Sequence, residues 1–232
     1  MDIIKRNLFA ELRIQHFASN EQLEPMSRFK QQRLGALLAN IDYNNEGKTT
    51  MSTPILNRRL RHIQEGERHA IDASMDTLDL LKIIVSNVNA TINSGIPIKG
   101  IVALGQFLRT RGDKVDFIKL EQWLRKLHIS RMAQLQGSIL IQCFGFEIAE
   151  IPFVEFLEKD SLKLMNRTIT HTESHQKEEW HFRQDKTGFV HNNPTLLRRN
   201  LRKSIHYIKF APIETISNFI GNFARSLSEI EE

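Results

Sequence analysis

The feature that most constrains this chain is a succession of apolar stripes at helical spacing between residues 76 and 145. The first stripe ends at Ser94-Gly95, and its members are Leu80, Ile83, Ile84, Val88 and Ile92. Further stripes follow after Pro97, Asp116 and Ser130, with short connections between them. We expect Asp116 and Ser130 to cap the helices that they precede. Because this spacing places apolar side chains on one helix face, and short connections favour antiparallel neighbours, we predict an antiparallel multi-helix bundle.

The flanking regions complete a mainly α fold in this prediction. Leu8 to His16 alternate weakly, as in a strand, whereas residues 26–39 have helical spacing. We expect Pro54 to open a basic helix that carries Arg58, Arg59, Arg61 and Arg68. A further helix is expected from Pro152 to about Arg167. The predicted regions are a short mixed N-terminal segment and polar loop (1–53), a helical core (54–167), a polar loop or arm (168–193), and two C-terminal helices that pack on the core (194–232).

Composition places the chain among globular proteins. Its apolar share is 41% and its charged share is 25%, which argues against wholesale disorder. Cys143 is the single cysteine and lies in an apolar run, so we expect a small core residue without an internal disulfide. No uncharged apolar stretch reaches the roughly 18 residues that span a bilayer. We therefore expect a cytoplasmic protein without a transmembrane segment.

Motifs that would carry catalysis or bind a metal are incomplete. Gly47-Lys48-Thr49 resembles part of a phosphate-binding loop, but Asp42 occupies the place of its first glycine. The cluster of His171, His175, His181 and His191 lacks a cysteine or fixed carboxylate as a further ligand. Asp72, Asp76 and Asp79 suit a helix start, where carboxylates oppose the dipole. We predict no catalytic residues, no metal site and no cofactor.

The strongest candidate for binding is a basic helix near the C-terminus, in a chain of net charge +5. Arg198, Arg199, Arg202 and Lys203 line one side, and no acidic residue lies between Pro194 and Lys209. Leu197, Leu201, Ile205 and Ile208 form the opposite stripe. Such a helix suits phosphates or anionic lipid, although a solvated outer face of a bundle has the same pattern. The four cations are our candidate anion-binding residues.

Ala211-Pro212 divides the basic helix from a last helix, which has the most regular apolar stripe of the chain. This stripe is formed by Ile213, Ile216, Ile220, Phe223, Leu227 and Ile230. Only Glu214, Arg225 and Glu229 carry charge around it, so it has no cationic face of its own for a membrane. We therefore expect this stripe to be buried against the helical core. Pairing with a second copy is the alternative.

Residues 117–140 also have the outline of a helix-turn-helix, with the break at His128-Ile129-Ser130. A recognition helix needs exposed side chains that reach bases. The second helix offers only Arg131, Gln134 and Gln136 before it becomes apolar, so this interpretation has little support.

Several short motifs together resemble the helical C-terminal region of an uncharacterised bacterial nucleotidyltransferase-like family, often associated with surface-polysaccharide loci. They are Ser94-Gly95-Ile96-Pro97-Ile98-Lys99, Val115-Asp116-Phe117, Phe144-Gly145-Phe146-Glu147 and Ile151-Pro152-Phe153, with Asn57-Arg58-Arg59-Leu60 upstream and Leu197-Arg198-Arg199-Asn200-Leu201-Arg202 downstream. The resemblance covers roughly residues 50 to 230. It implies a helical protein related to the non-catalytic half of such enzymes.

The catalytic motif of that superfamily is missing. It would need a Gly-Ser turn followed by paired aspartates that hold metal ions on the triphosphate. The sole Gly-Ser, Gly137-Ser138, precedes Ile139-Leu140-Ile141-Gln142, which contains no carboxylate. We therefore expect a non-catalytic binding or accessory protein, with a protein partner or an anionic ligand. The alternatives are a nucleotidyltransferase subunit that needs a separate catalytic chain, and a small DNA-binding regulator with nucleic acid as its partner.

Overall fold

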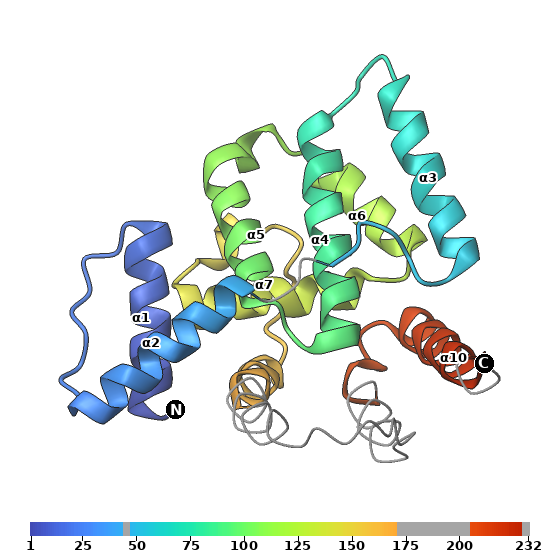
Figure 1. Cartoon of the computed structure of the whole chain (residues 1–232). Coiled ribbons are helices and arrows are strands. Elements are labelled where there is room, and N and C mark those ends of the chain that lie inside the picture. Colours follow the sequence, from blue (N-terminus) through green and yellow to red (C-terminus); the bar gives the residue numbers. More distant parts are fainter. Residues whose placement is uncertain (44–46, 171–204, 229–232) are drawn as a thin grey trace.

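The computed structural model describes residues 1–43, 47–170 and 205–228; the side chains of residues 42, 43 and 222–228 are outside that description (Figure 1). Helices and short turns make up these ranges, and they contain no strand. The prediction of a mainly α-helical bundle is confirmed. Within the same ranges, no helix has the length and apolar character needed to cross a membrane.

The centre of the bundle is α4 (Met75–Ser94), which packs against α3 (Pro54–Arg68) and α5 (Ile98–Arg111). These neighbours run antiparallel, as the short connections predicted (Figure 1). The stripe predicted from the sequence lies inside, with Leu80 and Ile84 fully buried. Ser74 begins α4 by accepting a hydrogen bond from the amide of Thr77, and a 3₁₀ turn, η1 (Gly112–Lys114), follows α5.

Helices α6 (Phe117–Lys126) and α7 (Ser130–Phe144) follow, and both pack against α4. The side chain of Asp116 accepts a hydrogen bond from the amide of Lys119 at 2.9 Å, so the predicted cap of α6 is confirmed. The predicted cap of α7 is wrong, because Ser130 is its first helical residue and no side chain caps it. Gly145 ends α7 with φ of 69°, a conformation that favours glycine.

Buried amides fix how the central helices meet. Asn87 of α4 donates to the carbonyl of Gly100 at 3.0 Å and to Oε1 of Gln136 at 3.1 Å. Gln136 in turn donates to the carbonyl of Ile84. A Cβ at Gly100 would lie 1.9 Å from Oδ1 of Asn87, so this contact between α4 and α5 needs glycine. Buried polar groups are stabilising only when they are paired, and this network pairs α4, α5 and α7.

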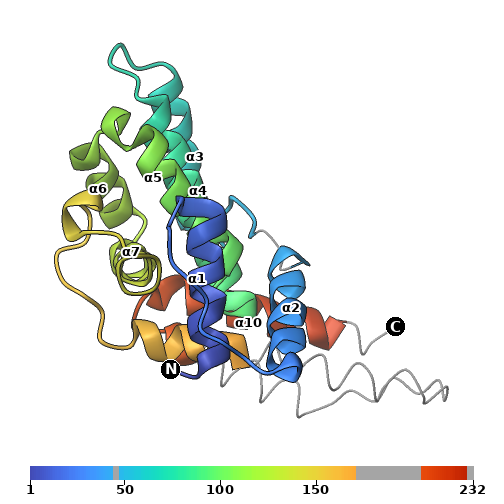
Figure 2. The same cartoon turned by 90° about the vertical axis from the view of Figure 1, so that its left-hand side faces the viewer.

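The strand-like interpretation of Leu8 to His16 is wrong, because Ile3–Phe17 form helix α1. Leu8 and Leu12 are every second member of the alternation and, with Ile4, have the spacing of four residues that places side chains on one helix face. They belong to the same core as α4. Figure 2 shows α1 against the rest of the bundle, where it packs on α5, α7 and α2 (Arg28–Tyr43).

The helix expected from Pro152 is also wrong in its first half. A 3₁₀ turn, η2 (Ile148–Glu150), and further turns precede a helix that begins at residue 161 and includes residues up to 170. Ile151, Phe153 and Val154 are buried in the turns instead. A Cβ at Gly137 would lie 2.3 Å from Val154, so the missing side chain in α7 makes room for this segment. Packing against α7 therefore outweighs the local tendency to form a helix.

The last element, α10 (Pro212–Ser228), begins at the predicted Ala211-Pro212 break, but the predicted burial of its stripe is wrong in the described part. Ile213, Ile216 and Ile220 are exposed; Phe223, Leu227 and Ile230 lie outside the described side chains. The segment is anchored instead by Tyr207, Phe210 and Ala211, and burial raises the pKa of Tyr207. Polar groups on neighbouring elements decide which face of α10 turns inward.

Candidate anion-binding site

The cations singled out from the sequence lie outside the described residues. Arg198, Arg199, Arg202 and Lys203 fall within 171–204, as do His171, His175, His181 and His191. The anion-binding role of the basic segment therefore stays a prediction. Lys209, the last cation of this basic segment, lies within the described residues. Its Nζ contacts Oδ2 of Asp160 and lowers the pKa of that carboxyl.

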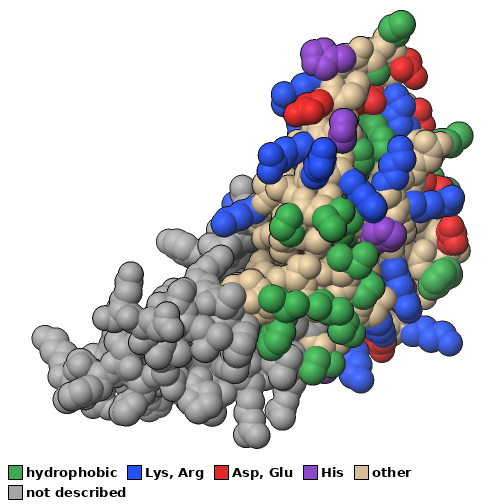
Figure 3. Space-filling model, turned by 90° about the vertical axis from the view of Figure 1, so that its right-hand side faces the viewer, with side chains coloured by type: hydrophobic (Ala, Val, Ile, Leu, Met, Phe, Trp, Pro, Cys, Tyr) green, Lys and Arg blue, Asp and Glu red, His purple; other side chains and the backbone are tan. Residues whose placement is uncertain are grey.

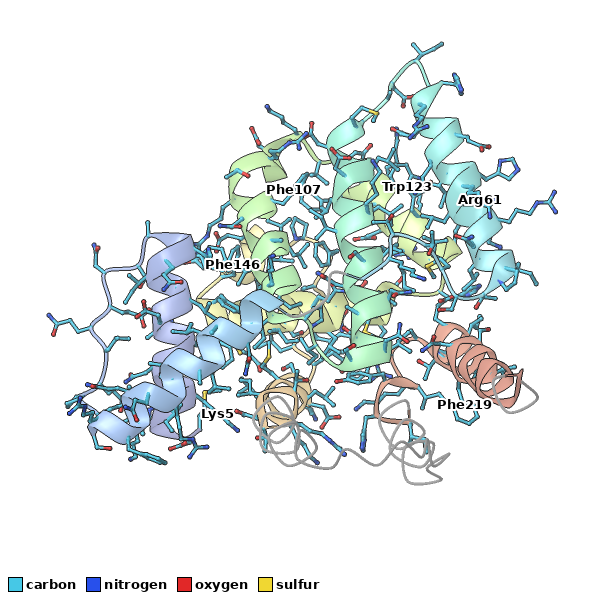
Figure 4. The ribbon with its side chains drawn as sticks, in the orientation of Figure 1. Lys5, Arg61, Phe107, Trp123, Phe146 and Phe219 are labelled. Carbon is cyan, nitrogen blue, oxygen red and sulfur yellow. The ribbon has the colours of Figure 1, made fainter. Side chains whose placement is uncertain are left out.

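The basic helix predicted after Pro54 is present as α3. Pro54 occupies its first turn, and Leu56 and Leu60 are buried against the core. This orientation leaves Arg58 and Arg61 exposed. Figure 4 shows Arg61 extending away from α4 into solvent. The outer surface of α3 is therefore cationic.

A groove of about 420 Å³ lies between α3 and α6. This volume is within the range of small-molecule sites, roughly 300–1,000 Å³. Figure 4 shows Trp123, one of the lining residues, lying inward of the outer surface of α3. The groove is lined by Arg59, His62, Ile63, Gly66, Glu67, Trp123 and Lys126. Apolar side chains thus lie beside cations from two separate helices.

The one acidic residue of the groove, Glu67, is already compensated. Its side chain is buried, and Oε1 accepts hydrogen bonds from Nζ of Lys119 at 3.0 Å and from the amide of Ser74 at 2.6 Å. The hydrogen bond to Glu67 raises the pKa of Lys119, which stays charged. Because Lys119 neutralises Glu67, the carboxylate does not cancel the positive charge at the mouth of the groove.

The remaining basic side chains of the groove have no carboxylate partner among the described residues. Arg59 donates to the carbonyl of Lys126 at 3.0 Å and lies 3.3 Å from Nε2 of His128. This hydrogen bond holds the guanidinium on the α6 side without neutralising it. Arg59, His62 and Lys126 are all solvent-exposed. Positive charge contributed by two helices beside apolar side chains suits an anion.

A second, smaller groove of about 280 Å³ lies against helix 161–170. Its lining is Asp160, Lys163, Leu164, Arg167, Ile205, His206 and Lys209. Here one of the cations is paired with a carboxylate, since Lys209 contacts Asp160, and Arg167 contacts His206. The α3–α6 groove is therefore the better candidate for an anion-binding site.

The aspartates considered as a metal cluster are held by cations. Asp76 pairs with Arg111 at 2.5 Å, and Asp79 pairs with Lys82 at 2.9 Å. Asp72, which is largely exposed, lies 3.6 Å from Lys119. Across residues 1–43, 47–170 and 205–228, no three His, Cys, Asp or Glu side chains are close enough to hold a metal ion.

Two sequence motifs have structural roles. Gln134 and Gln136 of α7 are buried, so the helix-turn-helix interpretation is wrong: this helix does not present them to DNA. Gly47-Lys48-Thr49 follows helix α2 in the chain and lies against α4, where Gly47 accepts a hydrogen bond from Oγ of Ser86 at 2.7 Å. A phosphate-binding loop connects a strand to a helix, which this segment does not.

Reasoning from the sequence identified the basic helix but not the groove. Arg59, His62 and Gly66 are spaced so that they share one face of α3, and this signal is present in the sequence. Trp123 and Lys126 come from α6, much later in the chain, and nothing local indicates that they face α3. Comparison with protein-family models, curated proteins and solved structures found no match to this chain.

Proposed function

We propose that this chain is a non-catalytic helical protein that binds an anionic ligand in the α3–α6 groove. The observation that carries the proposal is the pair of exposed cations Arg59 and Lys126, together with the exposed His62, beside the half-buried Ile63. The acidic residue in the same groove is paired with Lys119. An anion with an apolar portion matches both the charge and the lining.

An accessory rather than enzymatic role is part of this proposal, in line with the resemblance to the non-catalytic half of a nucleotidyltransferase-like protein. Its support is the setting of Gly137-Ser138, which would carry the catalytic turn in such an enzyme. Ser138 is buried, donates to the carbonyl of Gln134 at 2.8 Å and accepts from the amide of Glu158 at 3.0 Å. These bonds give the motif a structural role within α7.

The test uses Trp123 as a reporter. The chain has two tryptophans, and replacing the other, Trp180→Phe, leaves Trp123 as the sole indole in the molecule. Pyrophosphate and ATP are titrated at low salt, with fluorescence and calorimetry as readouts. We expect saturable binding that weakens as salt is added, because charge pairs exposed to solvent are screened.

The variant Arg59→Glu with Lys126→Glu should weaken this binding at least about tenfold, since two attractive charges become repulsive. The matched control is Arg28→Glu with Lys30→Glu on α2, which makes the same charge change on exposed residues at the other side of the bundle (Figure 1). Equal losses in both variants would contradict a groove site. Release of pyrophosphate from nucleoside triphosphates with magnesium would contradict the non-catalytic role.

A further inference from the structure

The outward face of α10 is apolar and uncovered. Ile213, Ile216 and Ile220 are 39%, 48% and 59% exposed, and Ile55, in the first turn of α3, is 66% exposed. Figure 3 shows hydrophobic side chains gathered on this side of the molecule, with Lys and Arg above and beside them. Large apolar side chains that gather in this way mark an interaction site.

Polar contacts on the inward face hold α10 in this orientation. Both carboxylate oxygens of the buried Glu214 accept hydrogen bonds, from the amide of Ser52 at 2.6 Å and of Thr53 at 3.0 Å. The hydroxyl of Thr53 donates to Oγ of Ser217, and Asn218 donates to Asn93 of α4. Turning the isoleucines inward would break these bonds and leave a carboxylate poorly paired, which is unfavourable.

The cations beside the apolar face come from α3. Thr53 contacts α10 directly and precedes Ile55 by two positions, so the first turn of α3 adjoins α10. Arg58, Arg59 and His62 follow Ile55 at helical spacing on the same side of α3. The apolar face and the mouth of the α3–α6 groove are therefore parts of one surface.

Negative charge is absent from the described outward face of α10. Glu214 is the one acidic residue between Pro212 and Gly221, and it is buried. An anionic surface could approach the isoleucines without meeting a carboxylate of this helix. The tertiary structure thus provides the cationic neighbour that the last helix lacks in its own sequence.

We propose that this surface docks on an anionic lipid bilayer, with the isoleucines of α10 and Ile55 among the acyl chains and the cations of α3 on lipid phosphates. This inference rests on the proposed function, because it names the source of the anion. Peripheral helices bind membranes through such a combination of apolar and cationic side chains.

A bilayer fits these side chains better than a protein partner does. The exposed apolar residues on α10 and at the start of α3 are isoleucines, which have no hydrogen-bonding group. Protein interfaces are enriched in Trp, Tyr and Arg anchors that fill pockets, and neither of the two grooves described here is lined by Ile55 or by the exposed isoleucines of α10. Aliphatic side chains need no shape complementarity to enter a lipid layer.

The experiment is co-sedimentation of the full chain with vesicles of phosphatidylcholine containing phosphatidylserine, and with vesicles of phosphatidylcholine alone. We expect binding to the anionic vesicles only. Ile216→Ser and Ile220→Ser should each weaken it by about tenfold or more, as expected when an inserted aliphatic side chain is lost. The control Ile148→Ser changes an isoleucine of similar exposure on η2 and should have no effect.

The charge contribution is tested with Arg58→Glu plus Arg61→Glu, which leaves the lining of the groove unchanged. We expect this pair to weaken vesicle binding at least about tenfold, since each basic residue near the surface contributes to the attraction. Pyrophosphate binding in the groove should be retained. The control is again Arg28→Glu with Lys30→Glu, and circular dichroism checks that every variant is folded.

Several results would overturn the inference and leave the proposed function intact. Pyrophosphate binding without vesicle binding is the clearest of them. If Ile216→Ser and Ile220→Ser left vesicle binding unchanged, attraction between charges alone would account for the binding. A dimer that Ile216→Ser converts to a monomer would assign the face to a second copy, and equal binding to uncharged vesicles would exclude a role for the cations. The opposite case is vesicle binding by a wild-type chain that does not bind pyrophosphate, which would contradict the groove site and not the docking of the apolar face.

Discussion

Helices α1 and α10 differ in how well the regularity of the apolar pattern in the sequence predicts which residues are buried. The sequence of α1 alternates weakly, yet its residues Ile4, Leu8 and Leu12 are buried in the core. The sequence of α10 has the most regular apolar stripe, yet the described members of that stripe are exposed. Periodicity therefore shows which residues share a helix face, whereas the neighbouring elements decide which face is buried.

The neighbours of the two helices differ in kind. Phe9 of α1 meets Phe144 of α7 edge to face, with ring centroids 5.6 Å apart, and Phe17 meets Phe144 and Phe146 in the same way. Helix α10 meets the backbone amides of Ser52 and Thr53, which need an acceptor. The aromatic rings of α7 and its C-terminal end are best covered by apolar side chains of α1. The amides of Ser52 and Thr53 need an acceptor, which the carboxylate of Glu214 provides.

The largest effect is expected from Phe9→Ala in α1. Removing a buried aromatic ring typically lowers the free energy of unfolding by about 3–5 kcal/mol. Phe29→Ala on α2 is the control, because Phe29 is 68% exposed. Urea denaturation followed by circular dichroism gives both values. Similar values for the two variants would show that α1 is not part of the core.

Glu214→Ala should have the next largest effect and tests the polar attachment of α10. It leaves the amides of Ser52 and Thr53 without their acceptor, a loss of about 1–3 kcal/mol for buried groups. Glu155→Ala, which removes an exposed carboxylate, should be nearly neutral. Hydrogen exchange should also show faster exchange at Ser52 and Thr53. Unchanged exchange there would mean that another group holds α10.

The pH dependence of stability tests whether the thiol of Cys143, at the end of α7 that packs against α1, is buried. Burial raises the pKa of the Cys143 thiol to about 12, although nearby Arg13 lowers it. Between about pH 9 and pH 12 the unfolded chain loses this proton while the folded chain keeps it. The free energy of unfolding should therefore fall as pH rises, by about 1.4 kcal/mol per pH unit from this group.

Denaturation of wild type and Cys143→Ala at several pH values isolates this contribution. The difference between the two slopes, rather than either slope alone, is the measured quantity, because tyrosine and lysine side chains titrate in the same range. A thiol reagent should also react with Cys143 only after unfolding. Identical slopes, or rapid labelling of the folded chain, would contradict burial of the thiol.

The smallest effect on stability is expected from Ile216→Ala in α10. Substitutions on the surface usually change the free energy of unfolding by no more than about 0.5 kcal/mol. A buried stripe would instead give a loss of several kcal/mol. A loss of that size at Ile216 would show that α10 packs through its apolar face in solution.

Local signals predicted most element boundaries. Pro54 opens α3, Asp116 caps α6 and Gly145 ends α7, each for a reason that depends on one or two neighbouring residues. The sequence also revealed Arg59 as part of a basic helix. It could not reveal the groove, because Lys126 and Trp123 reach it from α6 through the packing of both helices on α4.

The sequence by itself determined that this chain is helical, where most helices begin and end, and that α3 carries a basic outer face. These properties depend on contacts within a few residues. The tertiary structure alone decided that α1 is buried, that Glu214 binds the start of α3, and that the isoleucines of α10 lie beside cations. Burial and charge pairing depend on groups that are far apart in the chain, and a local sequence pattern does not indicate which of these groups come into contact.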